Sequence, residues 1–149
     1  MTVLVVGYGN TLRGDDGAGQ YVVGRVSELV GDARTLQLHQ LTPELTLDLA
    51  EVDLVIFVDA RADEPERGIV VEEISAADGT ASSHHVSPGS LILIARRLFG
   101  RAPRGVLVSL PAYSFEYSES LSENTRIAAV AAVDLIVGLI DREDARATE

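Results

Sequence analysis

The chain has 149 residues, the length of one ordinary domain, and its hydrophobic fraction of 46% favours a packed globular protein. Its 23 acidic residues exceed its 12 basic ones and give a net charge of −11, which argues against binding to nucleic acid or to an anionic membrane surface. The absence of cysteine excludes disulfides, a thiolate nucleophile and cysteine-bound zinc, and fits a cytoplasmic protein. All of the basic residues are arginines.

The first third of the chain alternates between strand and helix signals. Residues 2–7 are apolar and β-branched without alternation, which predicts a strand buried on both faces. Apolar residues at helical spacing predict a helix over 17–30, with Asp15 or Asp16 as its N-cap. Residues 33–41 alternate between polar and apolar side chains and are predicted to form a second strand.

The middle of the chain continues this pattern. A second helix is predicted over 42–50, because this segment opens with a threonine cap followed by proline. Residues 53–60 form the second clearly buried strand, which ends in Asp59. A polar loop leads to a strand at 69–74, and residues 75–87 show no regular pattern and are expected to form a loop.

The last third begins with a strong helix signal. Residues 87–100 open with serine and proline and end in glycine, which are typical helix boundaries. A strand is predicted at 105–110, and a long closing helix at 120–142 with Ser122 as its cap. The apolar run in this helix is too short to span a membrane, and Asp134 interrupts it.

Five strands alternating with helices predict an α/β fold in one domain, residues 1–149, with a mostly parallel twisted sheet and helices on both faces. In such sheets, binding sites form outside the carboxyl ends of the strands. Asp15 and Asp16 follow the first strand and Asp59 ends the third, so we expect these three carboxylates at one edge of the sheet.

The glycine-rich segment GYGNTLRGDDGAG at 7–19 has the setting of a phosphate-binding loop. However, Asp15 and Asp16 stand where a P-loop carries lysine and serine or threonine. The dinucleotide pattern also fails, because Leu12 occupies the position of its third glycine. Carboxylates at the head of a helix instead favour a metal cation, provided that other ligands converge on it.

Further ligands are available elsewhere in the sequence. Asp59 ends an apolar run, where burying an unpaired carboxylate would be costly, so a partner is expected for it, and the segment SSHHVSP at 82–88 could supply that partner. His84 and His85 lie in a loop just before a helix, and imidazole beside carboxylates is a common ligand set for zinc or nickel. His39, near the end of the second strand, is interpreted as a packing or supporting residue.

Two other site types are disfavoured. A phosphoacceptor receiver domain needs an acidic pair close to the end of its first strand and a lysine after its fifth, and this chain contains no lysine. An acylating hydrolase has little support, because the G-x-S-x-G motif is absent.

With these residues in view, the chain closely resembles the hydrogenase maturation proteases, endopeptidases that trim the C-terminus of [NiFe]-hydrogenase large subunits. The segments that carry the resemblance lie at 7–19, 39–45, 55–60 and 83–100. The run LPAYSFEYSESLS at 110–122 further resembles the branch that serves bidirectional, NAD-coupled hydrogenases. The resemblance implies a three-layer α/β/α sandwich and a monomeric enzyme.

The resemblance also implies a site and a substrate. The substrate would be the hydrogenase large-subunit precursor, and the metal would be the nickel of that substrate rather than a cofactor of the enzyme. The residues that contact this nickel in the family are matched here by Asp16, Asp59 and either His84 or His85. Asp15 is predicted to cap the helix. Cleavage would follow either from a carboxylate of Asp16 or Asp59 acting as general base on water, as in an aspartyl-type endopeptidase, or from polarisation by the metal.

Two functions of other classes stay open at this point. A non-catalytic, chaperone-like partner that senses the metal of another protein would bind the precursor without cutting it. A small-molecule or nucleotide enzyme that uses the same sheet edge would bind a phosphate ligand, although the incomplete glycine patterns count against it.

Overall fold

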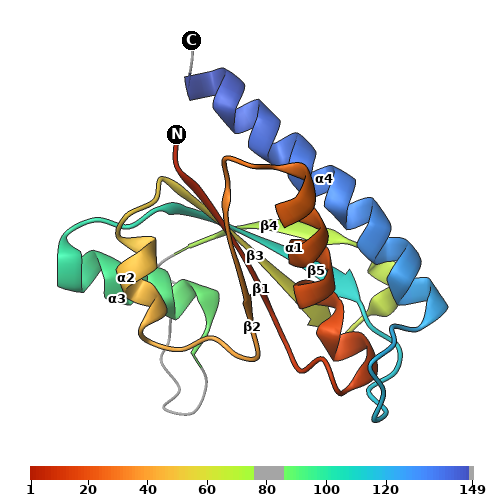
Figure 1. Ribbon diagram of the computed structural model, residues 1–149. Helices are drawn as coiled ribbons and strands as arrows, with labels where there is room; N and C mark the ends of the chain where they lie inside the picture. Colours follow the sequence, from red (N-terminus) through yellow and green to blue (C-terminus); the bar gives the residue numbers. More distant parts are fainter. Residues whose placement is uncertain (76–85, 148–149) are drawn as a thin grey trace.

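The computed structural model describes residues 1–75 and 86–147, and one five-stranded sheet forms its centre (Figure 1). The strands are β1 (Val3–Tyr8), β2 (Arg34–Leu38), β3 (Leu54–Arg61), β4 (Val70–Ile74) and β5 (Arg104–Pro111). Their order in the sheet is β2-β1-β3-β5-β4, with parallel pairing throughout except between β4 and β5. The predicted mostly parallel sheet is therefore confirmed.

Helices cover both faces of the sheet and give the predicted three layers (Figure 1). The α-helices are α1 (Ala18–Leu29), α2 (Leu45–Leu49), α3 (Pro88–Phe99) and α4 (Glu123–Ala147), and two short 3-10 helices are η1 (Gly14–Gly17) and η2 (Pro65–Arg67). Helices α1 and α4 pack on one face, and α2 and α3 pack on the other. No helix in the described part of the chain is long and apolar enough to cross a membrane.

The sheet separates two hydrophobic cores. Val3 and Val5 of β1 pack towards α1 and α4, whereas Leu4 and Val6 pack towards α2 and α3. Successive side chains of a strand point to opposite faces, so a central strand with a core on each side must be apolar at every position. This explains why β1 and β3 lack the alternation of a half-exposed strand.

The two predicted ends of α3 are confirmed, whereas other helix boundaries differ from the prediction: α1 has no side-chain cap, and α4 continues to Ala147 instead of ending at residue 142. Ser87 forms a capping box with Ser90 at the start of α3, and Gly100 ends that helix with a φ of 73°. At α2 the predicted threonine cap is wrong. Leu45 is the first helical residue, and the Thr42 hydroxyl bonds the Glu44 carboxylate instead of a backbone N–H.

Candidate functional site

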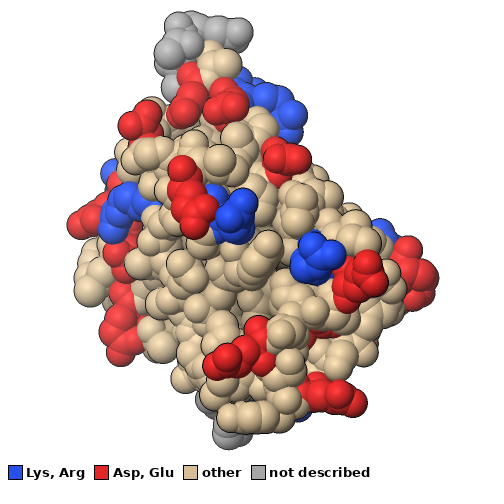
Figure 2. Space-filling view, turned by 45° about the vertical axis from the view of Figure 1, so that its right-hand side comes forward, with Lys and Arg blue, Asp and Glu red and all other residues tan. Residues whose placement is uncertain are grey.

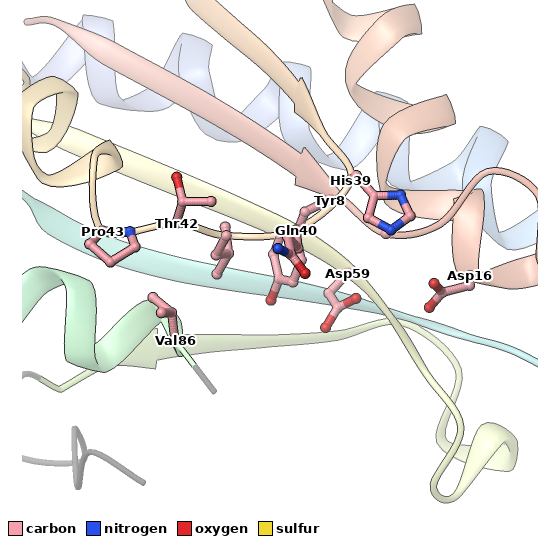
Figure 3. Close-up of a pocket in the computed structure, with 10 residues that line it drawn as sticks. Tyr8, Asp16, His39, Gln40, Thr42, Pro43, Asp59 and Val86 are labelled. Carbon is pink, nitrogen blue, oxygen red and sulfur yellow. The ribbon is translucent and has the colours of Figure 1, made fainter. Parts of the chain in front are cut away.

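An open cavity of about 420 Å³ lies at the carboxyl ends of β1, β2 and β3 (Figure 3). Polar and carboxylate side chains gather at one end, and apolar side chains gather at the other. The lining residues are Tyr8, Gly9, Asp16, His39, Gln40, Leu41, Thr42, Pro43, Asp59 and Val86. The cavity therefore lies at the edge of the sheet where the sequence predicts the site, and two of the predicted residues, Asp16 and Asp59, line it.

Tyr8 is the hydrogen-bond partner of Asp59. Gly7 and Val58 are paired in the parallel ladder of β1 and β3, so the two residues that follow them stand side by side on the same face of the sheet. The Tyr8 hydroxyl bonds the Asp59 carboxylate, and the Tyr8 ring packs edge-on against Phe57 with 6.4 Å between ring centroids. Asp59 therefore has a partner, but it is Tyr8, which sequence reasoning did not identify. The histidines that the sequence suggests as its partner, His84 and His85, lie outside the described residues.

Asp59 is held in an environment that disfavours its charge. Burial raises the pKa of its carboxyl group to about 6, and the nearby charge of Asp16 also raises it. Hydrogen bonds from the Ala60 backbone N–H, at 2.8 Å, and from Tyr8 act in the opposite direction. A carboxyl group with a pKa of about 6 can exchange a proton near neutral pH, which suits a general base.

Asp16 is oriented by the loop that precedes it. Its carboxylate accepts a 2.7 Å hydrogen bond from the backbone N–H of Asn10. Gly9 makes this loop possible, because its φ is 143° and a Cβ at this position would collide with the backbone carbonyl oxygen of Asp16. The glycine-rich segment thus holds a carboxylate at the cavity rather than a phosphate.

Asp15 has a different role from the predicted helix cap. Neither η1 nor α1 has a side-chain cap, and the side chain of Asp15 is fully buried. Its carboxylate accepts hydrogen bonds from the backbone N–H groups of Tyr113, Ser114 and Ser122 and from the Ser122 hydroxyl, at 2.6–2.9 Å. Burial raises the pKa of Asp15, but these hydrogen bonds outweigh burial and lower it below the usual value. Asp15 therefore fastens the β5–α4 loop to the loop that carries Asp16.

Arg61 fixes the loop that follows β3. Its guanidinium donates hydrogen bonds to the carbonyl oxygens of Asp63, at 2.9 Å, and Gly68, at 2.7 Å. It also donates to the Ser109 hydroxyl of β5, at 2.8 Å. Ser109 pairs with Asp59 in the ladder of β3 and β5, so Arg61 ties the loop to the strand beside the site.

The histidines are placed differently from the prediction. His39 is exposed and lines the cavity near Asp16, so it is not a packing residue, and its predicted supporting role stays a prediction (Figure 3). The sequence feature that could have identified His39 as a site residue is its position directly after β2, at the same sheet edge as Asp59. His84 and His85 lie outside the described residues. Among the described residues, no three His, Asp or Glu side chains form a group that could hold a metal ion.

The substitution Tyr8→Phe tests the electrostatics of the site. It removes a hydrogen bond that favours the charged form of Asp59, so the pKa of Asp59 is expected to rise from about 6 by roughly one unit. The ionised fraction of Asp59 at a pH near 7 would then fall. Carboxyl ¹³C NMR titration measures this pKa directly. Tyr21→Phe, on the solvent-exposed side of α1, is the matched control, and an unchanged Asp59 pKa in Tyr8→Phe would contradict the assignment.

Comparison with solved structures identifies proteins of the same fold along nearly the whole chain. The hydrogenase maturating endopeptidase HybD from Escherichia coli is 21% identical, with a TM-score of 0.78, over 96% of this chain and 94% of that one. A [NiFe] hydrogenase maturation protease, HycI from Thermococcus kodakarensis, is 25% identical, with a TM-score of 0.76, over 94% and 92%. A hydrogenase 2 maturation peptidase from a Thaumarchaeota archaeon is 29% identical, with a TM-score of 0.70, over 95% and 99%.

No protein-family model matches the chain, and no curated protein matches it. The structural matches support homology with hydrogenase maturation endopeptidases, and their names agree with the enzyme class predicted from the sequence.

Proposed function

We propose that this chain is a peptidase that removes the C-terminal extension of a [NiFe]-hydrogenase large-subunit precursor after nickel insertion. The observation that carries the proposal is the pair of carboxylates, Asp16 and Asp59, on one cavity at the carboxyl edge of the sheet. The names of the similar structures support the reaction class. In this proposal the enzyme acts as a monomer in the cytoplasm, and the segment at 110–122 supports a bidirectional, NAD-coupled hydrogenase as the source of the substrate.

The nickel in this proposal belongs to the substrate. Asp16 and Asp59 would contact it through carboxylate oxygens, together with His84 or His85 from the segment before α3. Carboxylate and imidazole groups suit a divalent ion of this kind. Of these proposed nickel contacts, Asp59 lies in β3 and Asp16 lies in the loop after β1. Docking of the metallated precursor on them would bring the scissile peptide into the adjoining cavity.

Hydrolysis requires a water molecule, a base and a protonated leaving amine. A carboxylate oxygen of Asp59 that does not contact the nickel can accept a proton from water that attacks the scissile carbonyl carbon. The carbon–nitrogen bond then breaks, and the same carboxyl group can return the proton to the amine nitrogen. The substrate's nickel would supply Lewis-acid polarisation when it is present.

The three histidines are separable by substitution. We expect Ala at His84 or at His85, whichever contacts nickel, to abolish processing of the precursor, and Ala at the other to leave it nearly unchanged. His39→Ala is expected to lower kcat by roughly 10–100-fold, because it removes a polar group from the cavity wall without removing a nickel ligand. Initial rates of processing for the three variants measure this ranking. Loss of activity in His39→Ala alone would identify His39, directly after β2, as the imidazole ligand of the nickel.

The intact mass of the precursor tests the function as a whole. The nickel-loaded precursor is expected to lose a C-terminal peptide on incubation with this protein, and the nickel-free precursor is expected to keep it. Asp16→Ala should abolish the mass change. Binding of the verified cognate precursor without any mass change would overturn the peptidase proposal and would identify a non-catalytic partner that senses the metal.

A further inference from the structure

Two loops lie side by side next to the candidate site, at the carboxyl edge of the sheet (Figure 1). They comprise residues 9–17, which include Asp16, and residues 112–122, which connect β5 to α4. The backbone N–H of Gly14 donates to the carbonyl oxygen of Ser118 at 2.8 Å, and the N–H of Ser118 donates to that of Leu12 at 3.0 Å. With the Asp15 carboxylate bonded to both ends of the second loop, the two loops form one ordered surface.

This ordered surface presents an aromatic side chain to solvent. Tyr117 is 86% exposed. Leu12, whose carbonyl oxygen accepts the hydrogen bond from Ser118, is 43% exposed. Tyrosine is enriched in binding interfaces because it offers a large, stiff contact area with one polar end. A backbone that is already ordered also loses little entropy on binding, so these loops have the physical properties of a docking surface.

A hollow of about 230 Å³ lies on the other side of the Asp16 loop, next to this surface. Oxygen-bearing side chains dominate its polar lining, which contains one carboxylate, that of Glu119, and neither arginine nor histidine. Its lining residues include Thr11, Gln20, Gln37 and Glu119. A carboxylate in such a hollow can accept a bidentate pair of hydrogen bonds from a guanidinium group, which can also stack on a neighbouring aromatic ring.

The charge of the whole edge favours a basic occupant. The loops at 9–17, 39–44, 61–69 and 112–122, together with Asp59, carry nine acidic residues against three arginines. Within the described part of the chain, a single ion pair, between Arg67 and Glu64, involves these loops. Acids at the opposite edge of the sheet are paired with arginines, among them Asp48, Glu51, Asp53, Glu73 and Glu143. In the view of Figure 2, more acidic than basic side chains face outward at the lower end, where the loops lie.

We propose that Leu12, Tyr117 and the hollow beside Glu119 dock an arginine-containing segment of the hydrogenase precursor. This inference rests on the proposed function and extends it to a second contact, outside the cavity that holds Asp16 and Asp59. The carbonyl oxygen of Leu12 and the Asp16 side chain belong to the same short loop, so a precursor bound here would reach across that loop into the cavity.

The first experiment measures KM and kcat for processing of the nickel-loaded precursor by Tyr117→Ser and Glu119→Gln. Each is expected to raise KM roughly tenfold and to leave kcat unchanged, as for an exposed interface residue that touches no reacting atom. Leu29→Ser, 61% exposed at the far end of α1, is the control and should change neither value. Unchanged KM in both test variants, or an equal rise in the control, would overturn the proposal.

The second experiment identifies the arginine. Precursors with single Arg→Gln changes near the C-terminal extension are paired with Glu119→Gln in double-mutant cycles of KM. One arginine is expected to couple to Glu119, so that the double change raises KM no more than either single change. Additive effects for every arginine would overturn the guanidinium assignment.

Direct binding of the precursor separates this inference from the proposed function. If the wild-type chain binds the precursor without cutting it and Tyr117→Ser weakens binding, the peptidase proposal fails and the docking surface stands. If the precursor is cut and binding does not depend on Tyr117 or Glu119, the docking surface fails and the peptidase proposal stands.

Discussion

Asp59→Asn is expected to reduce processing of the nickel-loaded precursor by roughly 10²–10⁴-fold, the range for losing a general acid or base. The amide is nearly isosteric and still accepts the Tyr8 hydrogen bond, but it cannot take a proton from water. Asp63→Asn is the matched control, because this exposed carboxylate lies four residues further along the same strand–loop segment. Initial rates followed by intact mass give the comparison. Activity of Asp59→Asn within tenfold of wild type would contradict the role of Asp59.

The same substitution is expected to stabilise the fold at neutral pH. The pKa of Asp59 rises from 3.8 to about 6 on folding, so the folded state resists ionisation of this group. The loss of folding stability caused by the Asp59 charge is therefore absent below pH 4, grows as the pH rises from about 4 to about 6, and is complete above that range. One pKa unit corresponds to about 1.36 kcal/mol. Allowing for the partial exposure of Asp59, we expect the free energy of unfolding of Asp59→Asn to exceed that of the wild type by about 2 kcal/mol at pH 7.

Urea unfolding of both proteins at pH 7.5 and at pH 4 measures this effect. The stability difference between Asp59→Asn and wild type should be present at the higher pH and should largely disappear at the lower one. Equal stability at pH 7.5 would show that the Asp59 carboxylate is not destabilised by its surroundings. A more stable but inactive variant would show that the site holds a charge at the expense of stability.

Asp15→Asn is expected to destabilise the protein by about 3 kcal/mol, since it leaves buried hydrogen-bond donors without a charged acceptor. Four hydrogen bonds converge on this carboxylate from the β5–α4 loop. For a chain of this size the melting temperature should fall by roughly 10 °C. Asp32→Asn, an exposed carboxylate, is the control. A loss below 1 kcal/mol would contradict the role of Asp15 as the anchor of the two loops.

The pH dependence of Asp15 has the opposite sign to that of Asp59. The pKa of Asp15 is lower in the folded state than in the unfolded chain, so its contribution is complete above the unfolded value of 3.8. That contribution is lost as the pH falls through the folded pKa. The stability difference between wild type and Asp15→Asn should therefore be constant from pH 6 to pH 8 and should shrink in acid.

Local sequence patterns predicted the elements and the edge that carries the site. The apolar runs of β1 and β3 indicated burial on both faces, and the Ser87 and Gly100 signals gave both ends of α3. These features depend on residues a few positions apart, whose spacing follows the period of a strand or a helix. Because parallel strands end at a common edge, the same patterns were sufficient to bring Asp16 and Asp59 to one cavity.

The tertiary structure alone decided which groups those carboxylates face. Tyr8 meets Asp59 through the register of two strands that lie about fifty residues apart in the chain, and Asp15 binds backbone groups 98–107 residues away. No local pattern encodes such pairings, so the sequence patterns indicated a cap of its own helix for Asp15 and a packing or supporting role for His39. Strand order and register set the distances between groups remote in sequence, and those distances determine the pKa of Asp59 and the burial of Asp15.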